Sequence, residues 1–395
     1  MKNQSLGKST CSVWAGEEEY LLQNATQVPV VHSVSFGYKD INQWQQVALG
    51  IQKGHIYSRN TNPTVEVFEN KICQLENAQA ATSASTGMGI ISSTLFSFLV
   101  PGQRVVSVKD TYGGTNKIFT EFLPRFKIEV TLCNTTDHEA IEAEIERGCD
   151  LLYLETPTNP TIKIIDLARL AKAGKKNGAV VVVDNTFATP INQQPLALGA
   201  DLVLHSATKF LGGHADAMGG VVCGEKELIK QIYHYREING ATLDAMSAYL
   251  LLRGMKTLAL RIERQNSNAL EIAKYLSSHP KIKKVFYPGL ESHEGYEIAN
   301  RQMSGFGGML SFILKENTFE AVGRVLACLK YAHSAANLGS VETIVGPPAT
   351  TSHVECSKEE RQAMGIPESL IRYSTGIEDV RDLMDDLDNA LSKLK

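Results

Sequence analysis

The chain has 395 residues, of which 43% are hydrophobic and 21% charged, a balance typical of a globular protein too long for one ordinary core. Its 39 basic and 43 acidic residues give a formal net charge of −4 with no block of like charge, which argues against a nucleic-acid partner. The opening residues 1–7 lack the apolar core of a signal peptide, and the apolar stretch 89–100 is too short and hydroxyl-rich to span a bilayer. We therefore expect two domains, no membrane contact and a cytoplasmic location.

Neither the cysteines nor the histidines indicate a metal site or a disulfide framework. The seven cysteines form no close pairs, which fits a reducing compartment. The ten histidines include no His-x-x-x-His unit, and no Cys-x-x-Cys unit occurs, so we expect no metal. The cysteines are Cys11, Cys73, Cys133, Cys149, Cys223, Cys328 and Cys356.

The first 60 residues are predicted to form an extended arm. They show no strong hydrophobic alternation and carry scattered glycine and proline, with Tyr57 and Arg59 near the end. We assign residues 1–60 to this arm, 61–253 to a larger α/β domain and 254–395 to a smaller α/β domain.

From about residue 70 to 224 the chain alternates helical patterns with short β-branched runs, a spacing that predicts β/α crossovers. Strands that are apolar throughout are buried on both faces, so we expect a mainly parallel sheet sandwiched by helices. Ligands of such sheets bind at the carboxyl ends of the strands. The expected strands are 105–108, 128–132, 151–154, 180–183, 202–204 and 220–222.

The run Thr86-Gly87-Met88-Gly89 precedes an apolar helical segment, 90–99, so its backbone N–H groups lie at a helix N-terminus. Such an end binds anions. A Gly-x-Gly pattern is a weak signal by itself, and the nucleotide-binding P-loop pattern does not occur in the chain.

Three polar features lie just beyond predicted strand ends: the loop 155–159, Asp184 and Lys209. Asp184 ends a run of four valines, where a carboxylate without a partner is costly to bury. A protonated pyridine nitrogen would compensate this charge. The alternative is a structural cap on the turn that follows Asp184.

Lys209 follows the expected strand 201–206, and its neighbours Ser206, Thr208 and a Gly-Gly pair leave room for a ligand beside the amine. The pKa of a lysine falls when the side chain is desolvated or lies near other cations, and such a lysine can form a Schiff base with a carbonyl compound. Pyridoxal phosphate (PLP) is the usual carbonyl compound. The alternative is a lysine that reaches from a strand end into solvent. The flanking His205 and His214 are interpreted as hydrogen-bonded structural residues.

Six motifs occur in one order along the chain: Tyr57-Ser-Arg-Asn-Thr-Asn-Pro-Thr64, Thr111-Tyr-Gly-Gly-Thr115, Glu155-Thr-Pro-Thr-Asn-Pro160, Val183-Asp-Asn-Thr-Phe-Ala188, Ser206-Ala-Thr-Lys-Phe210 and Ile371-Arg-Tyr-Ser-Thr-Gly-Ile-Glu-Asp379. Together they strongly resemble the Cys/Met-metabolism family of PLP enzymes, which contains cystathionine γ-synthases, cystathionine γ-lyases, methionine γ-lyases and O-acetylhomoserine sulfhydrylases. The likeness runs almost end to end. It implies a fold-type-I PLP enzyme whose larger domain binds the cofactor.

The resemblance also implies residue roles. Lys209 would hold PLP and move protons, Asp184 would pair with the pyridine nitrogen, and Tyr112 would stack on the ring and act as an acid. Arg372 would bind the substrate α-carboxylate, with Asn337 and Tyr57 nearby on the substrate side. The remaining cofactor contacts would come from Ser206, Thr208, the backbone of Gly87 and Met88, Glu155, Asn159, Tyr57 and Arg59.

In this family the arm that carries Tyr57 and Arg59 reaches into the active site of a neighbouring subunit. The resemblance therefore implies a homodimer with shared active sites, assembled further into a homotetramer. The alternative for Arg59 is an ordinary surface arginine on the arm.

Markers of substrate choice conflict. Gly114 stands where methionine γ-lyases resemble one another in having a cysteine, and the surrounding loop 112–116 is similar to that of cystathionine enzymes. Ala336, however, stands where many cystathionine enzymes carry a glutamate, and Asn337 and Pro347 also depart from the common pattern. We expect cystathionine γ-synthase-like replacement at Cγ of an O-acylated or sulfur-containing homoserine. The alternatives are a cystathionine or methionine γ-lyase, an O-acylhomoserine sulfhydrylase and, remotely, a PLP-binding regulator without catalysis.

Overall fold

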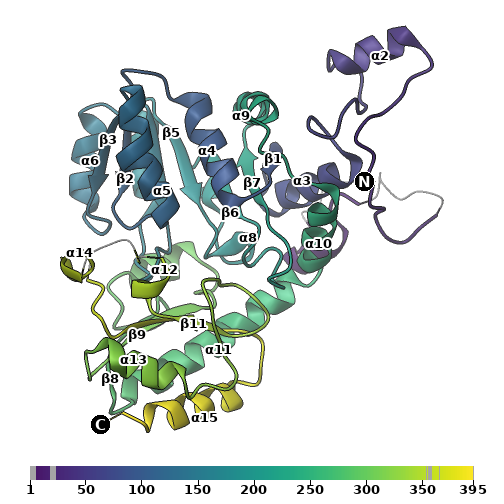
Figure 1. The fold of residues 1–395 in the computed structure, drawn as a ribbon. Coiled ribbons are helices and arrows are strands. Elements are labelled where there is room, and N and C mark those ends of the chain that lie inside the picture. The colour runs from purple at the N-terminus through teal and green to yellow at the C-terminus, as the bar shows by residue number, and fades with distance from the viewer. Residues whose placement is uncertain (1–5, 18–23, 353, 355–357, 364, 395) are drawn as a thin grey trace.

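Two β-sheets, one of seven strands and one of five, organise the chain, and helices pack on both (Figure 1). The computed structural model describes residues 6–17, 24–352, 354, 358–363 and 365–394. The α/β class expected from the alternation of patterns is confirmed. Six of the cysteines are free thiols, while Cys356 lies outside the described residues.

The larger sheet has the strand order β1-β7-β6-β5-β4-β2-β3, in which β2 to β6 run parallel, so the expected mainly parallel sheet is confirmed. β7 instead lies antiparallel to both neighbours, because the loop from 207 to 219 contains no crossover helix that could return the chain in the parallel direction. β1 was not expected, since its sequence Ala-Ala-Thr-Ser-Ala lacks a β-branched run. The strands are β1 (Ala80–Ala84), β2 (Arg104–Val108), β3 (Glu129–Cys133), β4 (Leu151–Glu155), β5 (Val180–Asp184), β6 (Leu202–Ser206) and β7 (Gly220–Gly224).

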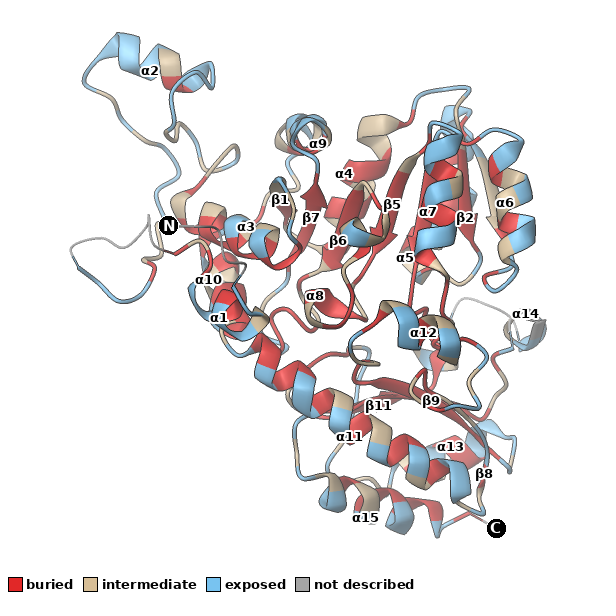
Figure 2. Cartoon of the chain, turned by 180° about the vertical axis from the view of Figure 1, so that it is seen from behind, coloured by how far each residue is buried: buried red, intermediate tan, exposed pale blue. Residues whose placement is uncertain are grey.

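Helices cover both faces of this sheet because the strands bury side chains on both sides (Figure 2). On one face α4 (Gly87–Phe98) and α9 (Lys226–Asn239) pack, and on the other α6 (His138–Glu146) and α7 (Leu167–Lys176). A further group of helices packs beside β1 and β7: α3 (Pro63–Leu75), α10 (Ala245–Met255) and the first part of α11 (Leu258–Ser278). Two short helices, α5 (Gly113–Lys117) and α8 (Thr189–Asn192), follow strand ends.

The smaller sheet has the order β10-β11-β12-β9-β8 and packs against α11, α13 (Phe319–Leu326) and α15 (Val380–Leu391). α11 runs along both parts of the molecule, from the helices beside the larger sheet to the smaller sheet (Figure 2). The strands are β8 (Ile282–Phe286), β9 (Met309–Leu314), β10 (His333–Ser334), β11 (Ile344–Gly346) and β12 (Leu370–Ser374), and the short helices are α12 (Tyr296–Gln302) and α14 (Lys358–Ala363).

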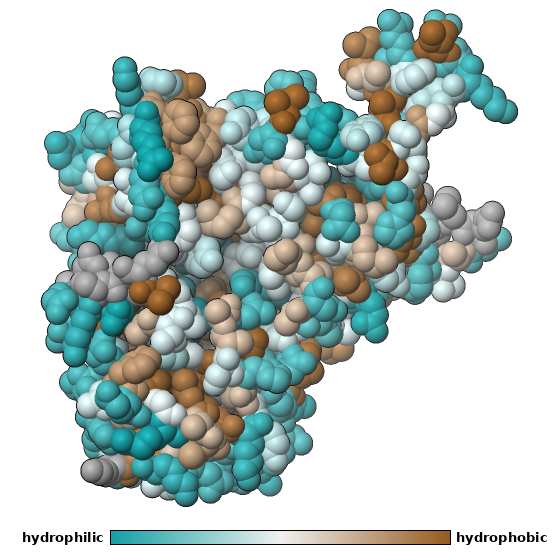
Figure 3. All heavy atoms as spheres, viewed as in Figure 1, coloured by the Kyte–Doolittle hydropathy of each residue, from teal (hydrophilic) through white to brown (hydrophobic). Residues whose placement is uncertain are grey.

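The N-terminal segment begins with α1 (Lys8–Trp14), which packs on the body of the molecule beside α3 and α11, and the part that carries α2 (Ile41–Ala48) projects away from the body (Figures 1 and 2). We expected an extended arm here, and the structure adds two short helices to it. α2 forms because Asp40 caps it, accepting from the Asn42 N–H at 2.9 Å. The side chains of Ile41 and Trp44 are 75% and 48% exposed, and hydrophobic residues are visible on the surface of this projection (Figure 3).

Candidate active site

A cavity of about 300 Å³ lies at the carboxyl ends of the parallel strands, where loops of the second part of the chain also reach it. Every residue predicted for the site lines this cavity except Tyr57 and Arg59. The lining residues include Gly87, Met88, Tyr112, Glu155, Asn159, Asp184, Ser206, Thr208, Lys209, Asn337 and Arg372.

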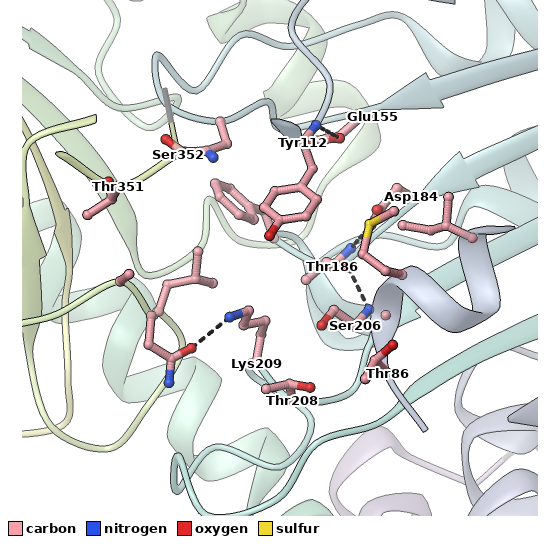
Figure 4. A pocket seen from close by; sticks show the side chains of 18 of the residues that line it. Thr86, Tyr112, Glu155, Asp184, Thr186, Ser206, Thr208, Lys209, Thr351 and Ser352 are labelled. Atoms are coloured by element: carbon pink, nitrogen blue, oxygen red, sulfur yellow. Dashed lines mark hydrogen bonds between the residues drawn. The ribbon is translucent and has the colours of Figure 1, made fainter. Parts of the chain in front are cut away.

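Lys209 lies on the turn that follows β6, and its backbone N–H donates to the Ser206 carbonyl at 3.1 Å. Its Nζ donates to Asn337 Oδ1 at 2.7 Å (Figure 4). Burial and, after it, the positive charge of Arg372 together lower the pKa of the amine to about 8. At pH 7 about a tenth of the Lys209 amine is therefore neutral and nucleophilic, far more than for a lysine with the ordinary pKa of 10.5.

Asp184 ends β5 and is 7% exposed. Its Oδ1 accepts from the Thr186 N–H at 3.0 Å, and its Oδ2 accepts from the Tyr153 hydroxyl at 3.4 Å. Burial raises the pKa of the carboxyl, since desolvation disfavours the charged form. Within the described part of the chain no lysine or arginine forms an ion pair with Asp184, so a cationic ring nitrogen fits this position.

Glu155 is the register partner of Asp184 on the neighbouring strand β4. Its Oε2 accepts from the Tyr112 N–H at 2.7 Å, which fixes the loop that carries the Tyr112 ring. Burial, followed by the charge of Asp184, raises the pKa of Glu155 well above its usual range. Glu155 thus orients Tyr112, and the Tyr112 hydroxyl and the Lys209 amine point into the same space (Figure 4).

The N-terminus of α4 meets the end of β6 at this cavity. Thr86 caps the helix by accepting from the Gly89 N–H at 2.9 Å, and the first-turn N–H groups of Gly87 and Met88 lack acceptors within the helix. A Cβ on Gly87 would lie 2.8 Å from Ser206 Oγ, so only glycine allows the helix end to approach this hydroxyl. Backbone N–H groups beside the hydroxyls of Ser206 and Thr208 are a donor set that fits a phosphate.

Arg372 reaches the cavity from β12 and is 6% exposed. Its guanidinium donates to Asn159 Oδ1 at 3.1 Å and to the Asn337 carbonyl at 3.2 Å. Burial lowers its pKa to about 10. Both partners are neutral, so a carboxylate of a bound amino acid would supply the missing negative charge.

Tyr57 and Arg59 lie outside the cavity of their own chain. Tyr57 is 42% exposed, and Arg59 lies over its ring with 5.7 Å between the guanidinium carbon and the ring centroid. Arg59 Nη1 donates to the Glu237 carbonyl at 2.5 Å. The two residues are thus not brought to the site by the fold of one chain.

Several lining residues were missed by the sequence reasoning. Thr186 links two predicted residues, since its Oγ1 accepts from the Ser206 N–H at 2.9 Å while its own N–H donates to Asp184. Its place in the Asp-Asn-Thr motif was a usable signal. Thr351 and Ser352 carried no such signal, because only the tertiary fold returns that loop to the cavity. The flanking histidines act structurally: His205 hydrogen-bonds Glu76 at 2.6 Å, and His214 hydrogen-bonds the Gly212 carbonyl at 2.8 Å.

No cluster of three or more potential metal ligands occurs among the described residues. In the same part of the chain, no helix is both long and apolar enough to cross a membrane.

The chain resembles known proteins over its whole length. A family model described as Cys/Met metabolism PLP-dependent enzyme matches residues 9–392. An L-methionine gamma-lyase of Fusobacterium nucleatum subsp. polymorphum is 42% identical to this chain, and the alignment covers 100% of both chains. A cystathionine gamma-lyase of Bacillus subtilis is 42% identical over 92% of this chain and 95% of its own length. The crystal structure of a cystathionine gamma synthase from Xanthomonas oryzae pv. oryzae, in complex with aminoacrylate and cysteine, has a TM-score of 0.93 at 36% identity and covers 98% of each chain. These relatives have three different activity names, so the likeness does not single out one reaction.

Proposed function

Since this chain belongs to the Cys/Met-metabolism family of PLP-dependent enzymes, we propose that it eliminates or replaces a small uncharged sulfur or acyloxy group at Cγ of a four-carbon amino acid. The observation that carries this choice is the wall built by Ala336, Leu338, Thr351 and Ser352. None of these four side chains is ionisable, whereas the acidic and basic lining residues among those described are Lys209, Arg372, Asp184 and Glu155, each with another proposed role.

PLP, when bound, withdraws electrons from the substrate Cα and so lowers the cost of removing its proton. Asp184 would hold the pyridine nitrogen, while Ser206, Thr208 and the N-terminus of α4 would hold the phosphate. Arg372 binds the α-carboxylate. Lys209 Nζ takes the Cα proton and is free to pass it on, because its pKa of about 8 allows both protonation states near neutral pH.

γ-Replacement, the type of reaction that cystathionine γ-synthases catalyse, remains our first expectation. γ-Elimination is the alternative. The neutral wall favours an alkyl thiol over cysteine as the entering or leaving group. A missing charged contact to the distal ammonium of cysteine or cystathionine is worth about 1.5–3 kcal/mol, or roughly ten- to a hundredfold in affinity. γ-Elimination from methionine, whose departing thiol is uncharged, is supported by the same wall and by the likeness to methionine gamma-lyases.

Product analysis tests the proposal. The purified enzyme is supplied in separate reactions with O-acyl-homoserine plus cysteine, O-acyl-homoserine plus methanethiol, cystathionine, and methionine. We expect turnover of a Cγ-substituted substrate, with methanethiol used better than cysteine. Turnover of only Cβ-substituted amino acids such as cystine would contradict the proposal.

We further propose that Tyr57 and Arg59 complete the cavity of a neighbouring subunit. The support is their place beside a projecting arm whose hydrophobic residues are exposed (Figures 1 and 3), together with their distance from the cavity of their own chain. Arg59 would add a bidentate donor for the phosphate.

A further inference from the structure

Three buried polar side chains form a stripe along α11. Arg261, Gln265 and Asn268 are spaced by four and three residues, so they lie on one face of the helix. They are 3%, 0% and 2% exposed. We call these three residues the α11 stripe.

Each member of the α11 stripe donates to backbone carbonyls of a different segment. Arg261 donates to the carbonyls of Phe210 at 2.8 Å and Leu211 at 3.2 Å, directly after Lys209. Gln265 Nε2 donates to the Ser340 carbonyl at 2.8 Å, in the loop that carries Asn337.

The third member acts on the segment that follows β12. Asn268 Nδ2 donates to the carbonyls of Gly376 at 3.2 Å and Glu378 at 2.8 Å. β12 itself carries Arg372, so the stripe contacts, in order, the segments of Lys209, Asn337 and Arg372.

We propose that the α11 stripe is a positioning device that fixes the three segments bearing Lys209, Asn337 and Arg372 relative to one another. The inference rests on the roles given to these residues in the proposed function. The three segments come from distant parts of the chain, and one rigid helix touches all of them.

The stripe is more polar than packing alone requires. Arg261 forms no ion pair within the described part of the chain, and Gln265 Oε1 is buried without a hydrogen-bond partner. Both features cost stability, and well-packed apolar side chains would avoid the cost. The fold also makes room for Arg261, because a Cβ on Gly213 would lie 2.0 Å from its Nη1.

The segments held by Arg261 and Gln265 touch each other at the site. A Cβ on Gly339 would lie 2.7 Å from the Phe210 nitrogen, so the two backbones are in direct contact. The 2.7 Å hydrogen bond from Lys209 Nζ to Asn337 Oδ1 spans this contact. A small shift of the Ser340 segment would therefore move the acceptor away from the amine.

The test is a double-mutant cycle. Gln265→Met keeps the side-chain length, removes the donor to Ser340, and also removes the unpartnered Oε1. We expect kcat to fall about ten- to a hundredfold, as for other small displacements of a catalytic group, with a smaller change in KM. The visible circular dichroism of the bound cofactor should change as well. In the Asn337→Ala background the same substitution should have much less effect, because the acceptor that it positions is already missing.

The matched control is Asn266→Ala on the neighbouring position of α11. Asn266 hydrogen-bonds Asn192 at 2.9 Å and the Gly307 N–H at 2.8 Å, and neither of these residues lines the cavity. Asn266→Ala should lower the thermal stability without changing kcat or the visible circular dichroism of the bound cofactor. Full additivity of Gln265→Met with Asn337→Ala would overturn the inference.

A second stripe variant covers the case in which Gln265→Met does not fold. Asn268→Leu releases the segment after β12, so we expect it to raise KM for the amino acid more than it lowers kcat. Equal effects of Asn268→Leu and Asn266→Ala would overturn the inference. If wild-type protein retained no PLP after borohydride reduction, the proposed function itself would be wrong. That result is distinct from the outcomes that overturn only the positioning role of the α11 stripe.

Discussion

Burial and two neighbouring residues give Lys209 its chemical character. Burial removes water from the amine, Arg372 adds a nearby positive charge, and Asn337 offers a neutral acceptor at 2.7 Å. Arg372 disfavours the protonated amine and the neutral Asn337 stabilises it only weakly, so Lys209 loses its proton more easily than a surface lysine does.

Replacing Lys209 by alanine should abolish covalent attachment of PLP. Wild-type protein treated with borohydride should retain cofactor after denaturation and dialysis, and Lys209→Ala should retain none and lose its yellow colour. Lys175→Ala, which changes a surface lysine paired with Asp201, is the control and should behave like the wild type. Labelling of another lysine in the wild type would show that the assignment is wrong.

The pH dependence of cofactor capture should report the pKa of Lys209. Only the neutral amine attacks a carbonyl, so the rate at which cofactor-free protein captures PLP should rise with pH and level off above the pKa. We expect a midpoint at about 8, compared with 10.5 for an ordinary lysine. A midpoint close to 10 would contradict the burial argument.

Ala336 is the residue whose change should redirect substrate choice. Ala336→Glu places a carboxylate on the neutral wall, which should favour cysteine or cystathionine over a simple alkyl thiol. The expected gain in the ratio of kcat/KM values is about tenfold or more, the value of one charged contact. Ala336→Gln has nearly the same shape without the charge and should give a smaller gain. An unchanged preference in Ala336→Glu would count against the proposed role of this wall.

At the scale of elements, the site depends on the close approach of the α4 N-terminus to the end of β6. The helix brings its unpaired N–H groups and positive end, and the strand brings the hydroxyl of Ser206. Gly87 is the point of contact, since any side chain there would meet Ser206.

Gly87→Ala should therefore weaken cofactor binding. An added methyl group in a packed contact costs about 1–3 kcal/mol, so we expect the Kd for PLP to rise roughly tenfold or more. Titration of the cofactor-free protein with PLP measures this change. Gly323→Ala is the control, because a Cβ there meets nothing within 4 Å and the position lies inside helix α13. It should leave the Kd unchanged and raise thermal stability slightly. Equal affinities in the two variants would contradict the proposed contact.

At the scale of the whole molecule, the projecting arm is the feature on which the proposed shared site rests. Its helix α2 exposes Ile41 and Trp44 and has little contact with the body of its own chain (Figure 1). Exposed hydrophobic surface of this kind is typical of an interaction site. A second copy of the chain would cover it and receive Tyr57 and Arg59.

Mixing two inactive variants should test the shared site. Arg59→Ala and Lys209→Ala each lack one group, but a hybrid dimer contains one cavity with both groups intact. We expect mixed protein to regain up to about half the wild-type activity per hybrid dimer, since one of two sites is complete. Hybrids are identified by two different affinity tags. Tagged hybrids without recovered activity would argue that each site is built from a single chain.

The sequence by itself determined the local features of this protein. The valine run before Asp184, the small residues around Lys209 and the glycines before α4 predicted strand ends and an anion site, because those properties depend on neighbouring residues in the chain. The motifs then predicted the family and PLP. The sequence analysis did not predict α2 within the arm, a helix that capping by Asp40 stabilises.

Only the tertiary structure decided how distant segments combine. The reversed direction of β7 follows from the missing crossover helix, and β1 forms because it pairs with β7 rather than because its residues favour strands. Likewise, the return of Thr351 and Ser352 to the cavity and the contacts of α11 with three separate segments leave no local pattern in the sequence. The physical reason is that a cavity wall is set by packing between elements, whereas strand ends and helix caps are set by adjacent residues.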